Sequence, residues 1–365
     1  MASGMKIKKI IENRKIRVSV IGAGVWAIHS HIPVMKRRAN EIEFVGLCRP
    51  DLDEAQKVAE KFGFKMYSDD YKKVLEAGAD LVVVSSPALF HYEHAKAALL
   101  SGAHVLIEKP ITLNSRDCRD LIRISDETGL HVVCSFGWNY MSGFSKTTEL
   151  MNSNAIGEIC AIQLHMASGC KDLLTGDSIS STGLPEDRAD PRTYANPRFA
   201  GGGYLQTQFS HALGWFFGVF DLKPIEVYAR LQNEGLVGIE THASLSVKFE
   251  NDAIGTMSAS AFHMAAEQRQ QLQFNVFGAD GYIQIDLEHE WIKQWDRSGL
   301  VIVDLGPGSQ SYNCDGPPNA LLDLIQGRTQ ENKSPLTVGL RSVELIEATY
   351  ESGRFDKSVL IPVTN

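Results

Sequence analysis

A short β-branched run leads directly into a glycine turn near the start of the chain. Residues Ile16–Ile21 have the composition of a buried strand, the sequence Gly22-Ala-Gly-Val-Trp-Ala27 follows, and a helical pattern continues to Met35. Strand, glycine turn and helix in this order are the context in which a G-x-G-x-x-G/A motif binds a dinucleotide. Gly22 permits the tight turn, Gly24 lets the backbone approach a pyrophosphate, and the alanine that ends the motif lets the helix pack closely on the strand.

The first turn of the predicted helix supplies the groups that hold phosphates. Free backbone N–H groups and the positive end of the helix dipole both favour an anion at a helix N-terminus. We therefore predict that Gly22, Gly24, Val25 and Trp26 contact a dinucleotide cofactor. The Trp26 side chain, inside the turn, packs either on that cofactor or on a neighbouring loop.

Strand-like and helix-like segments then alternate up to about residue 137. The expected strands are 43–48, 80–87, 105–107 and 131–136, and the expected helices are 52–62, 92–101 and 115–129. Alternation at this spacing indicates a doubly wound parallel sheet. We predict an N-terminal Rossmann domain over residues 16–137, preceded at 1–15 by a tail in which Met1–Met5 resembles an added leader.

The second predicted strand ends at Arg49-Pro50-Asp51. In a Rossmann domain this position faces the adenosine ribose, where an acidic residue binds the 2′-hydroxyl of NAD and an arginine accommodates the 2′-phosphate of NADP. Arg49 favours NADP, whereas Asp51 is near enough in sequence to reach a ribose hydroxyl. The predicted cofactor is therefore NAD or NADP, and the sequence leaves the choice open.

A Glu-Lys-Pro sequence follows the strand run Val105–Ile107, with Glu108 and Lys109 at the carboxyl end of the strand. In an open parallel sheet, ligands bind in the crevice beyond the carboxyl ends of the strands. Lys109 is well placed there to exchange a proton with a substrate oxygen; an exposed Glu-Lys pair that merely closes a strand is the alternative. To act as a base at neutral pH, a lysine needs a lowered pKa, which burial and the positive charge of an oxidised nicotinamide both favour.

After about residue 138 the pattern changes to long alternating runs joined by short polar turns. The runs are 158–166, 226–231, 243–249, 254–261, 271–277 and 282–285. They indicate a large, mostly antiparallel sheet, with a hairpin turn at Asn251-Asp252 and a late helix over Leu340–Tyr350. We predict that residues 138–365 form an α+β domain that binds substrate and associates with further copies of the chain through its sheet.

A long polar stretch, Ser168–Phe199, interrupts that sheet. In a compact domain such a stretch is either an element that covers substrate or a surface excursion. Its side chains that can recognise substrate hydroxyls are those of Arg192, Tyr194, Asn196 and Arg198.

A second glycine turn, Gly201-Gly-Gly203, leads into an apolar helix. Thr207 and His211 are four residues apart and therefore share a helical face. A histidine on an apolar helix is more often a hydrogen-bonded core residue than a catalyst, so both interpretations stay open for His211. Tyr204 is interpreted as a core aromatic.

The composition excludes several classes of function. The chain has 365 residues, which favours two domains, and its net charge of −8 argues against a nucleic-acid partner. Its six cysteines form no C-x-x-C pair, as is typical of reduced, mostly buried thiols in a cytoplasmic protein. The longest apolar run, Ala212–Phe220, is too short to cross a membrane, and no signal peptide or metal motif is visible.

Together the motifs resemble those of the Gfo/Idh/MocA family of NAD(P)-dependent oxidoreductases, over essentially the whole chain after residue 15. The matching segments are Gly22–Ala27, Ser86-Pro87 with His91, Gly102–Pro110 and Gly201–His211. The resemblance implies a Rossmann domain that binds nicotinamide at the carboxyl edge of its sheet, and a substrate held against the sheet of the second domain.

The resemblance also implies roles for individual residues. In family members the residues that match Lys109 and His211 flank the reacting carbinol, and the substrates are usually sugars, inositols or sugar derivatives. The predicted catalytic residues are Lys109, His211 and Thr207. The predicted cofactor contacts are Gly22, Gly24, Val25, Trp26, Arg49, Ser86, Pro87, His91, Glu108, Lys109 and Asn139. The predicted substrate contacts are Lys109, Trp138, Tyr194, Arg198, Thr207 and His211.

The chain departs from the family pattern at three places. Thr207 stands where the family often has aspartate, Phe209 where it often has glycine, and Gly137-Trp138-Asn139 where it often has Asn-x-Arg. A threonine forms only neutral hydrogen bonds, so the proton relay is expected to rest on Lys109 and His211.

The expected reaction interconverts a secondary hydroxyl and a ketone on a sugar, glycoside or cyclic polyol, with the 3-hydroxyl of a glycoside as one candidate. Two alternatives remain: a glycoside-cleaving enzyme that retains and recycles its NAD, and a sensor of sugar or cofactor without catalysis. Retention of Lys109 and His211 argues against the sensor, whereas Thr207 and Asn139 keep it open.

Overall fold

The computed structural model divides the chain into two compact units. One contains residues up to Gly137 together with Cys314–Leu340, and the other contains Trp138–Asn313 and Arg341–Asn365. The structure describes residues 14–176, 191–234, 238–263, 270–309 and 311–362. The predicted leader at 1–5 lies outside the described residues.

The first unit contains a parallel sheet of six strands. These are β1 (Ile16–Ile21), β2 (Ile42–Cys48), β3 (Met66–Ser68), β4 (Leu81–Val84), β5 (His104–Ile107) and β6 (Val132–Cys134). They run in the order β3-β2-β1-β4-β5-β6, and every neighbouring pair is parallel. This order is that of a dinucleotide-binding Rossmann fold, with the reversal of strand order between β1 and β4. The predicted parallel, doubly wound sheet is confirmed.

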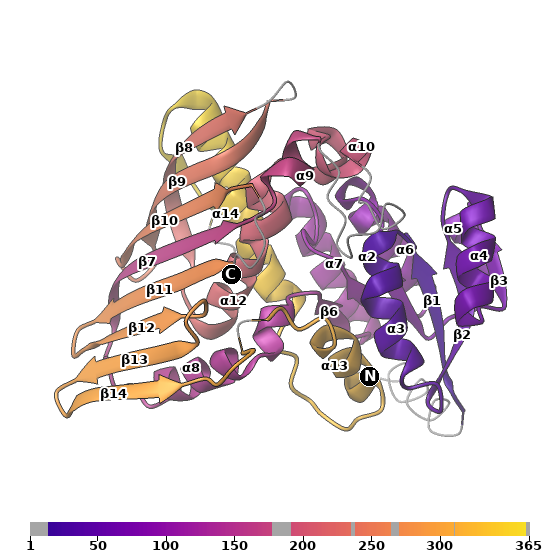
Figure 1. Ribbon diagram of the computed structural model, residues 1–365, viewed down its shortest axis with the longest axis horizontal. Coiled ribbons are helices and arrows are strands. Elements are labelled where there is room, and N and C mark those ends of the chain that lie inside the picture. The colour runs from indigo at the N-terminus through magenta and orange to yellow at the C-terminus, as the bar shows by residue number, and fades with distance from the viewer. Residues whose placement is uncertain (1–13, 177–190, 235–237, 264–269, 310, 363–365) are drawn as a thin grey trace. The chain divides into compact units, whose positions relative to one another are not determined.

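Helices connect these strands (Figure 1). They are α2 (Val25–His29), α3 (His31–Lys36), α4 (Leu52–Phe62), α5 (Tyr71–Glu76), α6 (His91–Leu100) and α7 (Ser115–Thr128). A further helix of this unit, α13 (Gly316–Ile325), comes later in the chain and connects none of these strands. The single helix predicted after the glycine turn is wrong, because Ser30 separates α2 from α3. Pro33 has no N–H to donate to the carbonyl of His29, which explains the break.

Residues 314–340 belong to the first unit, whereas the sequence analysis places them with the second. The reason is long-range packing on the edge of the Rossmann sheet. Helix α13 contacts β5 and β6, and Ser334 exchanges hydrogen bonds with Cys134 of β6, through its carbonyl oxygen at 2.8 Å and its hydroxyl at 2.7 Å. The helical or strand periodicity of a segment does not show that it packs against a unit formed by residues far earlier in the chain.

The second unit is built on a nine-stranded sheet. Its strands are β7 (Ile159–Ser168), β8 (Pro224–Glu234), β9 (Ile239–Phe249), β10 (Ile254–Ala261), β11 (Gln271–Gly278), β12 (Tyr282–Asp286), β13 (Trp291–Asp296), β14 (Gly299–Asp304) and β15 (Val359–Leu360). The order is β14-β13-β12-β11-β7-β10-β9-β8-β15, with only β7 and β10 parallel among these described strands. The predicted, mostly antiparallel sheet is confirmed, and the turn at Asn251-Asp252 joins β9 to β10, with Asp252 at a φ of 65°.

Several elements of the second unit are absent from the sequence prediction. Strands β13 and β14 lie at an exposed edge, where both faces of β14 meet solvent and the alternation is weak. The stretch predicted as a loop over 168–199 contains α9 (Lys171–Thr175) and α10 (Pro191–Tyr194) among its described residues, with α11 (Pro197–Ala200) at its end. The side chain of Arg192 is not among those described.

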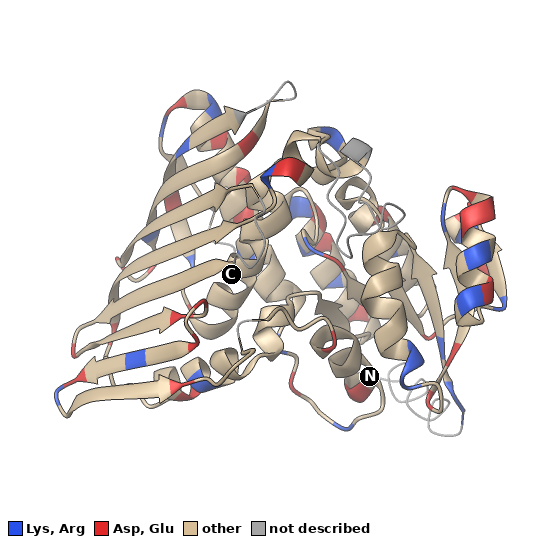
Figure 2. Ribbon diagram, in the orientation of Figure 1, with Lys and Arg blue, Asp and Glu red and all other residues tan. Residues whose placement is uncertain are grey.

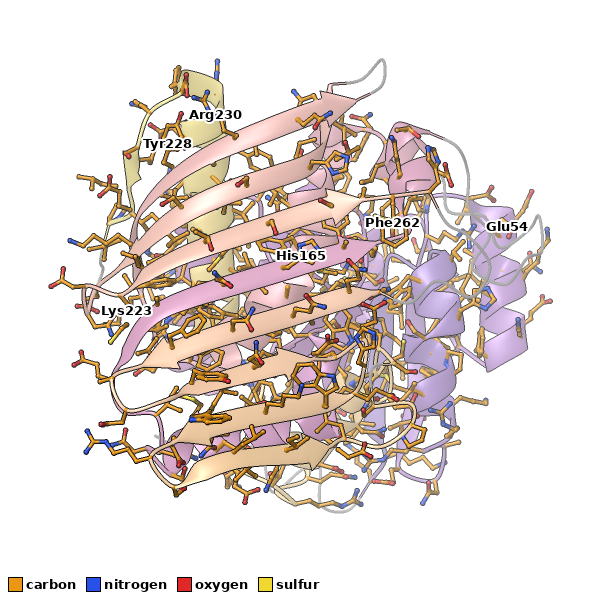
Figure 3. The ribbon with its side chains drawn as sticks, turned by 60° about the vertical axis from the view of Figure 1, so that its left-hand side comes forward. Glu54, His165, Lys223, Tyr228, Arg230 and Phe262 are labelled. Atoms are coloured by element: carbon orange, nitrogen blue, oxygen red, sulfur yellow. The ribbon has the colours of Figure 1, made fainter. Side chains whose placement is uncertain are left out.

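Helices cover one face of the nine-stranded sheet. They are α8 (Ser142–Asn152), the π-helical segment η4 (Leu205–Phe209), α12 (Ser210–Val219) and α14 (Leu336–Phe355), of which residues 341–355 belong to this unit. Trp215 of α12 stacks on Phe274 of β11 with ring centroids 4.4 Å apart. No described helix of the unit covers the other face, where the side chain of His165 is seen on β7 (Figure 3).

All six cysteines are free thiols, four of them buried, as the sequence predicts. Among the described residues, no helix combines the length and the hydropathy that a membrane crossing requires.

Candidate active site

The glycine turn after β1 is shaped by a close approach of two backbones. Gly22 has a φ of +90°, and a Cβ there would lie 2.2 Å from the backbone nitrogen of Ser86. Gly24 differs, because a Cβ built on it meets no atom within 4 Å. The turn therefore closes tightly against the segment after β4 and leaves open space at Gly24, the position at which a pyrophosphate approaches in this motif.

His91 supports the edge at which β4 and β5 end. Its imidazole is 1% exposed, and its two nitrogens lie 2.7 Å from the carbonyl oxygens of Ser86 and Pro110. Burial lowers the pKa of His91, and the hydrogen bonds to these carbonyls offset only part of that effect. His91 thus holds the segment that contains Ser86 and Pro87, and the cofactor contact predicted for it stays a prediction.

Glu108 is buried at the end of β5 and accepts hydrogen bonds from three directions. Its Oε1 accepts from Trp26 Nε1 at 2.8 Å and lies 2.7 Å from His31 Nε2, and its Oε2 accepts from the backbone N–H of Lys109 at 3.1 Å. Glu108 thus links the first two helices after the glycine turn, through Trp26 and His31, to the backbone of Lys109. The side chain of Lys109 is half-buried, and its peptide bond to Pro110 is cis.

Arg49 lies against the glycine turn. Its guanidinium donates to the carbonyl oxygen of Ala23 at 3.0 Å and lies 3.8 Å from the Glu54 carboxylate. Asp51 is the N-cap of α4, because its carboxylate accepts the Glu54 N–H at 3.0 Å. Both residues named by the sequence therefore stand at the carboxyl end of β2.

Two aromatic rings, those of Trp138 and Tyr312, pack beside His211 in the second unit. His211 and Trp138 have ring centroids 5.7 Å apart, and Tyr312 lies 4.7 Å from His211 and 5.8 Å from Trp138. Trp138 is 3% exposed, and its Nε1 finds no acceptor among the described residues. Tyr312 was missed, because it lies in an irregular segment without any periodic signal.

The remaining predicted residues of the second unit are placed as follows. Thr207 is buried and donates its hydroxyl hydrogen to the carbonyl of Gly203 at 2.8 Å. Asn139 is fully buried, and its Nδ2 donates to the carbonyl of Gly214 of α12 at 3.0 Å. The cofactor contact predicted for Asn139 stays a prediction. Tyr194 is half-buried and Arg198 is exposed. Tyr204 is fully buried, as predicted for a core aromatic.

A buried carboxylate holds the start of the helix that carries Thr207 and His211. Glu240 of β9 accepts the N–H of Gly203 at 2.8 Å, the N–H of Leu205 at 3.0 Å and the hydroxyl of Tyr350 at 2.8 Å. A Cβ on Gly203 would lie 2.2 Å from the Glu240 carbonyl oxygen, which explains glycine there. Sequence reasoning missed Glu240, because it stands beside buried Ile239 in a strand segment where alternation fails.

Burial raises the pKa of Glu240 despite these hydrogen bonds. The folded state therefore holds the Glu240 proton more firmly than the unfolded chain, and this contribution to stability falls as pH rises from the ordinary value of 4.5 to the raised pKa. We expect Glu240→Gln to keep the fold and lose this slope, and Glu240→Ala to cost about 3 kcal/mol by leaving buried donors unpaired. Thermal unfolding of both variants from pH 5 to 8 tests this, and parallel curves for the wild type and the Gln variant contradict it.

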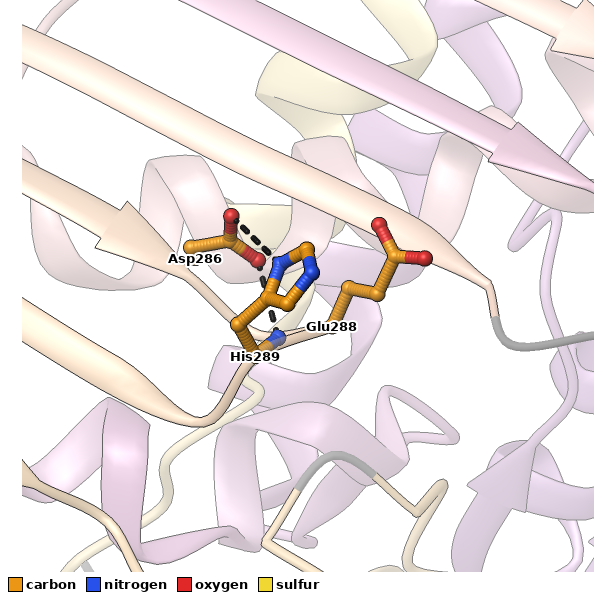
Figure 4. A group of neighbouring side chains, drawn as sticks. All are labelled: Asp286, Glu288 and His289. Carbon is orange, nitrogen blue, oxygen red and sulfur yellow. Dashed lines mark hydrogen bonds and ion pairs between the residues drawn. The ribbon is translucent and has the colours of Figure 1, made fainter.

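A group of Asp286, Glu288 and His289 in the turn after β12 brings its ligand atoms within 4.8 Å (Figure 4). The Asp286 carboxylate already accepts from the backbone N–H of His289 at 3.0 Å and from Gln273 at 3.1 Å, and it lies 3.0 Å from Nδ1 of His289. We assign no ion to this turn.

Two family models match successive parts of the chain. Residues 16–136 match the oxidoreductase family with an NAD-binding Rossmann fold, and residues 144–284 match the GFO/IDH/MocA C-terminal domain. The chain belongs to the GFO/IDH/MocA family of oxidoreductases. The resemblance inferred from the motifs, the enzyme class and an NAD-binding domain are thereby confirmed, and the open space at Gly24 fits such a cofactor.

Curated relatives of this GFO/IDH/MocA protein include sugar-modifying enzymes. D-glucoside 3-dehydrogenase of Escherichia coli K12 is 31% identical over 42% of this chain and 44% of its own length. A dTDP-3,4-didehydro-2,6-dideoxy-α-D-glucose 3-reductase of Streptomyces antibioticus is 24% identical over 82% of this chain and 86% of its own. The chain spans about half the length of the first two curated relatives, at 44% and 52%.

Solved structures show the same fold at low identity. Levoglucosan dehydrogenase in complex with NADH and levoglucosan has a TM-score of 0.77 and 16% identity, covering 96% of this chain and 100% of that one. The WlbA dehydrogenase of Bordetella pertussis, with NADH and UDP-GlcNAcA, has a TM-score of 0.76 and 17% identity over 96% of this chain and 100% of its own. At this identity the likeness establishes the fold alone.

Proposed function

We propose that the protein interconverts a secondary hydroxyl and a ketone on a sugar, glycoside or cyclic polyol, and that its leading substrate is the 3-hydroxyl of a glycoside. The observation that carries the proposal is the position of Lys109, two residues after the end of β5 at the carboxyl edge of an NAD-binding sheet. The names of the Escherichia coli and Streptomyces relatives, both acting at carbon 3 of a sugar, support the choice of position.

The proposed chemistry divides between cofactor and protein. When bound, oxidised NAD supplies the acceptor for the hydride that leaves the carbinol carbon. Either Lys109 or His211 takes the proton of the hydroxyl as general base, and in the reverse direction the same group returns it to the ketone oxygen. Thr207 contributes hydrogen bonding without charge.

Substrate contacts are proposed for Trp138, Tyr194 and Arg198 in addition to the proton-exchanging residues. Trp138 has the strongest support, because a buried indole N–H without an acceptor among the described residues is costly unless a ligand or water supplies an oxygen. Its ring packs beside His211, with centroids 5.7 Å apart.

We propose that NAD is preferred to NADP. The Arg49 guanidinium, which in isolation favours a 2′-phosphate, is already engaged with the Ala23 carbonyl and lies near Glu54. Acidic residues gather at the same end of β2, as the start of α4 shows in Figure 2. The carboxylates of Asp51, Asp53 and Glu54 at the start of α4 disfavour an added phosphate at this end of β2.

We propose that copies of the chain associate through the uncovered face of the nine-stranded sheet. Phe277, Tyr282 and Trp295 form a row of rings there, with successive centroids 6.0 and 6.4 Å apart. Trp295 is 48% exposed, and exposed aromatic rows of this kind favour an interface. Sedimentation equilibrium tests this proposal, and a monomer at micromolar concentration contradicts it.

A substrate screen tests the main proposal. Purified protein is incubated with glucosides, free sugars and inositols, each with NAD⁺ and with NADP⁺, and the absorbance of reduced nicotinamide is followed. We expect steady reduction of NAD⁺ by a glucoside, with a 3-ketone as product by NMR. Faster turnover of free inositols contradicts the glucoside assignment, and a single stoichiometric reduction without turnover contradicts an ordinary dehydrogenase.

A further inference from the structure

We propose that the buried carboxylate of Glu108 makes the cofactor site favour oxidised over reduced nicotinamide. This role rests on the NAD-dependent function proposed above. The oxidised ring carries a positive charge and the reduced ring carries none, so a fixed negative charge nearby stabilises only the oxidised form.

Three donors fix Glu108 as an ionised group. Trp26 and His31 both lie at Oε1, at 2.8 and 2.7 Å, and the Lys109 N–H lies 3.1 Å from Oε2. An ionised carboxylate accepts at both oxygens, whereas a protonated carboxyl must donate from one of them. Burial alone raises the pKa of Glu108, but the hydrogen bonds from His31 and Trp26 and the charge of Lys109 oppose burial, and the pKa is lowered.

The charge of Glu108 is not cancelled by His31. The Nδ1 atom of His31 is buried and has no hydrogen-bond partner among the described residues. A neutral imidazole with its hydrogen on Nε2 donates to Glu108 and leaves only a lone pair at Nδ1. An imidazolium would instead bury an N–H without an acceptor, which is costly. Glu108 therefore keeps a negative charge with a neutral donor beside it.

The strand order places this charge in the nicotinamide half of the site. The adenosine ribose of a Rossmann cofactor is read by the residue after β2, on one side of β1. The second nucleotide then lies across the reversal point, over β4 and β5, and Glu108 directly follows β5. Trp26 is 37% exposed while its N–H is held by Glu108, so the ring and the charge are fixed together at this edge.

The same charge affects the direction of the reaction. Oxidised nicotinamide that is stabilised by Glu108 is harder to reduce. The equilibrium between bound reactants is therefore displaced toward oxidised cofactor and alcohol, and away from reduced cofactor and ketone.

Calorimetric titration of the wild type, Glu108→Gln and Trp26→Phe with NAD⁺ and with NADH tests this inference without any substrate. We expect the ratio of the Kd for NAD⁺ to the Kd for NADH to rise about fivefold to tenfold in Glu108→Gln, the effect of one neighbouring unit charge. Trp26→Phe removes one hydrogen bond and keeps the charge, so both Kd values change by the same factor.

A smaller rise in the ratio, about twofold, is expected for Glu108→Asp, which keeps an ionised acceptor and withdraws it by one methylene group. The Asp variant carries the test if the Gln variant does not fold. A ratio equal to that of the wild type in either variant overturns the role of Glu108 and leaves the proposed function standing. A wild type that binds neither form of NAD overturns the proposed function itself.

Discussion

Replacing Lys109 by methionine is expected to lower kcat for alcohol oxidation by about 10²–10⁴, the range over which a general acid or base contributes to a rate. Methionine keeps the length and apolar stem of lysine and loses the amine that exchanges the hydroxyl proton. Lys109 stands where β5 ends, and its backbone N–H is held by Glu108. Its removal therefore affects proton transfer more than the fold. Steady-state kcat and KM, with a calorimetric Kd for NAD⁺, measure the effect.

The matched control is Lys96→Met on α6. Lys96 is a surface lysine whose amine lies 2.8 Å from Asp120, and we expect its loss to leave kcat unchanged. Lys109→Arg keeps a positive charge and accepts no proton at ordinary pH, so it separates charge from proton exchange. A Lys109→Met enzyme with more than a tenth of the wild-type kcat contradicts the assignment of Lys109 as the proton-exchanging group.

Much of the Rossmann unit could be predicted, because its information is local. The strand, the glycine turn and the start of the helix lie within Ile16–Ala27, and the same alternation repeats up to Val132–Cys134. Helix α4 agrees with its prediction at both ends, because Asp51 caps its N-terminus and Gly63 adopts a φ of 81° after it. The sequence prediction places residues 314–340 in the second domain, whereas they belong to the first unit, because their place depends on contacts with β5 and β6 that no neighbouring residue encodes.

A residue of the candidate site could be predicted where it belongs to a sequence motif. It could not be predicted where its role depends on a hydrogen-bond partner that is far away in the sequence. Gly22, Gly24 and Lys109 follow from the motifs and stand at the carboxyl edge of the sheet. Residues such as His31 and Glu240 act through partners 77 and 37 positions away in sequence. Such pairs leave no periodic trace in a single chain.

The same limit applies to two residues that are predicted to contact the cofactor. His91 and Asn139 are polar residues at motif positions, and polarity there suggests a ligand. Both are enclosed instead, at 1% and 0% exposure, and bind backbone carbonyls of their own units. A buried polar side chain bound to backbone is as well satisfied as one bound to a ligand, and sequence alone does not separate the two cases.

The two glycines of the turn are expected to respond in opposite ways to the same added methyl group. Gly22→Ala is expected to lower the free energy of unfolding by about 2–4 kcal/mol, because its positive φ strains an alanine and its Cβ collides with backbone. The collision is with the Ser86 backbone nitrogen at 2.2 Å, which no side-chain rotation relieves. In a domain of this size that loss corresponds to roughly 5–15 °C in Tm.

Gly24→Ala is expected to leave the Tm of the free protein within about 1–2 °C, because its φ of −82° suits alanine and its Cβ meets nothing within 4 Å. The Kd for NAD⁺ should instead rise at least about tenfold, since the methyl group occupies space that the pyrophosphate needs. Scanning fluorimetry with and without NAD⁺ measures both quantities on both variants.

If Gly24→Ala binds NAD⁺ like the wild type, the pyrophosphate does not approach this turn. If Gly22→Ala melts like the wild type, the close contact with Ser86 does not limit the fold. The opposed responses matter because general damage to the turn would lower stability and binding together, whereas a built cofactor site separates them.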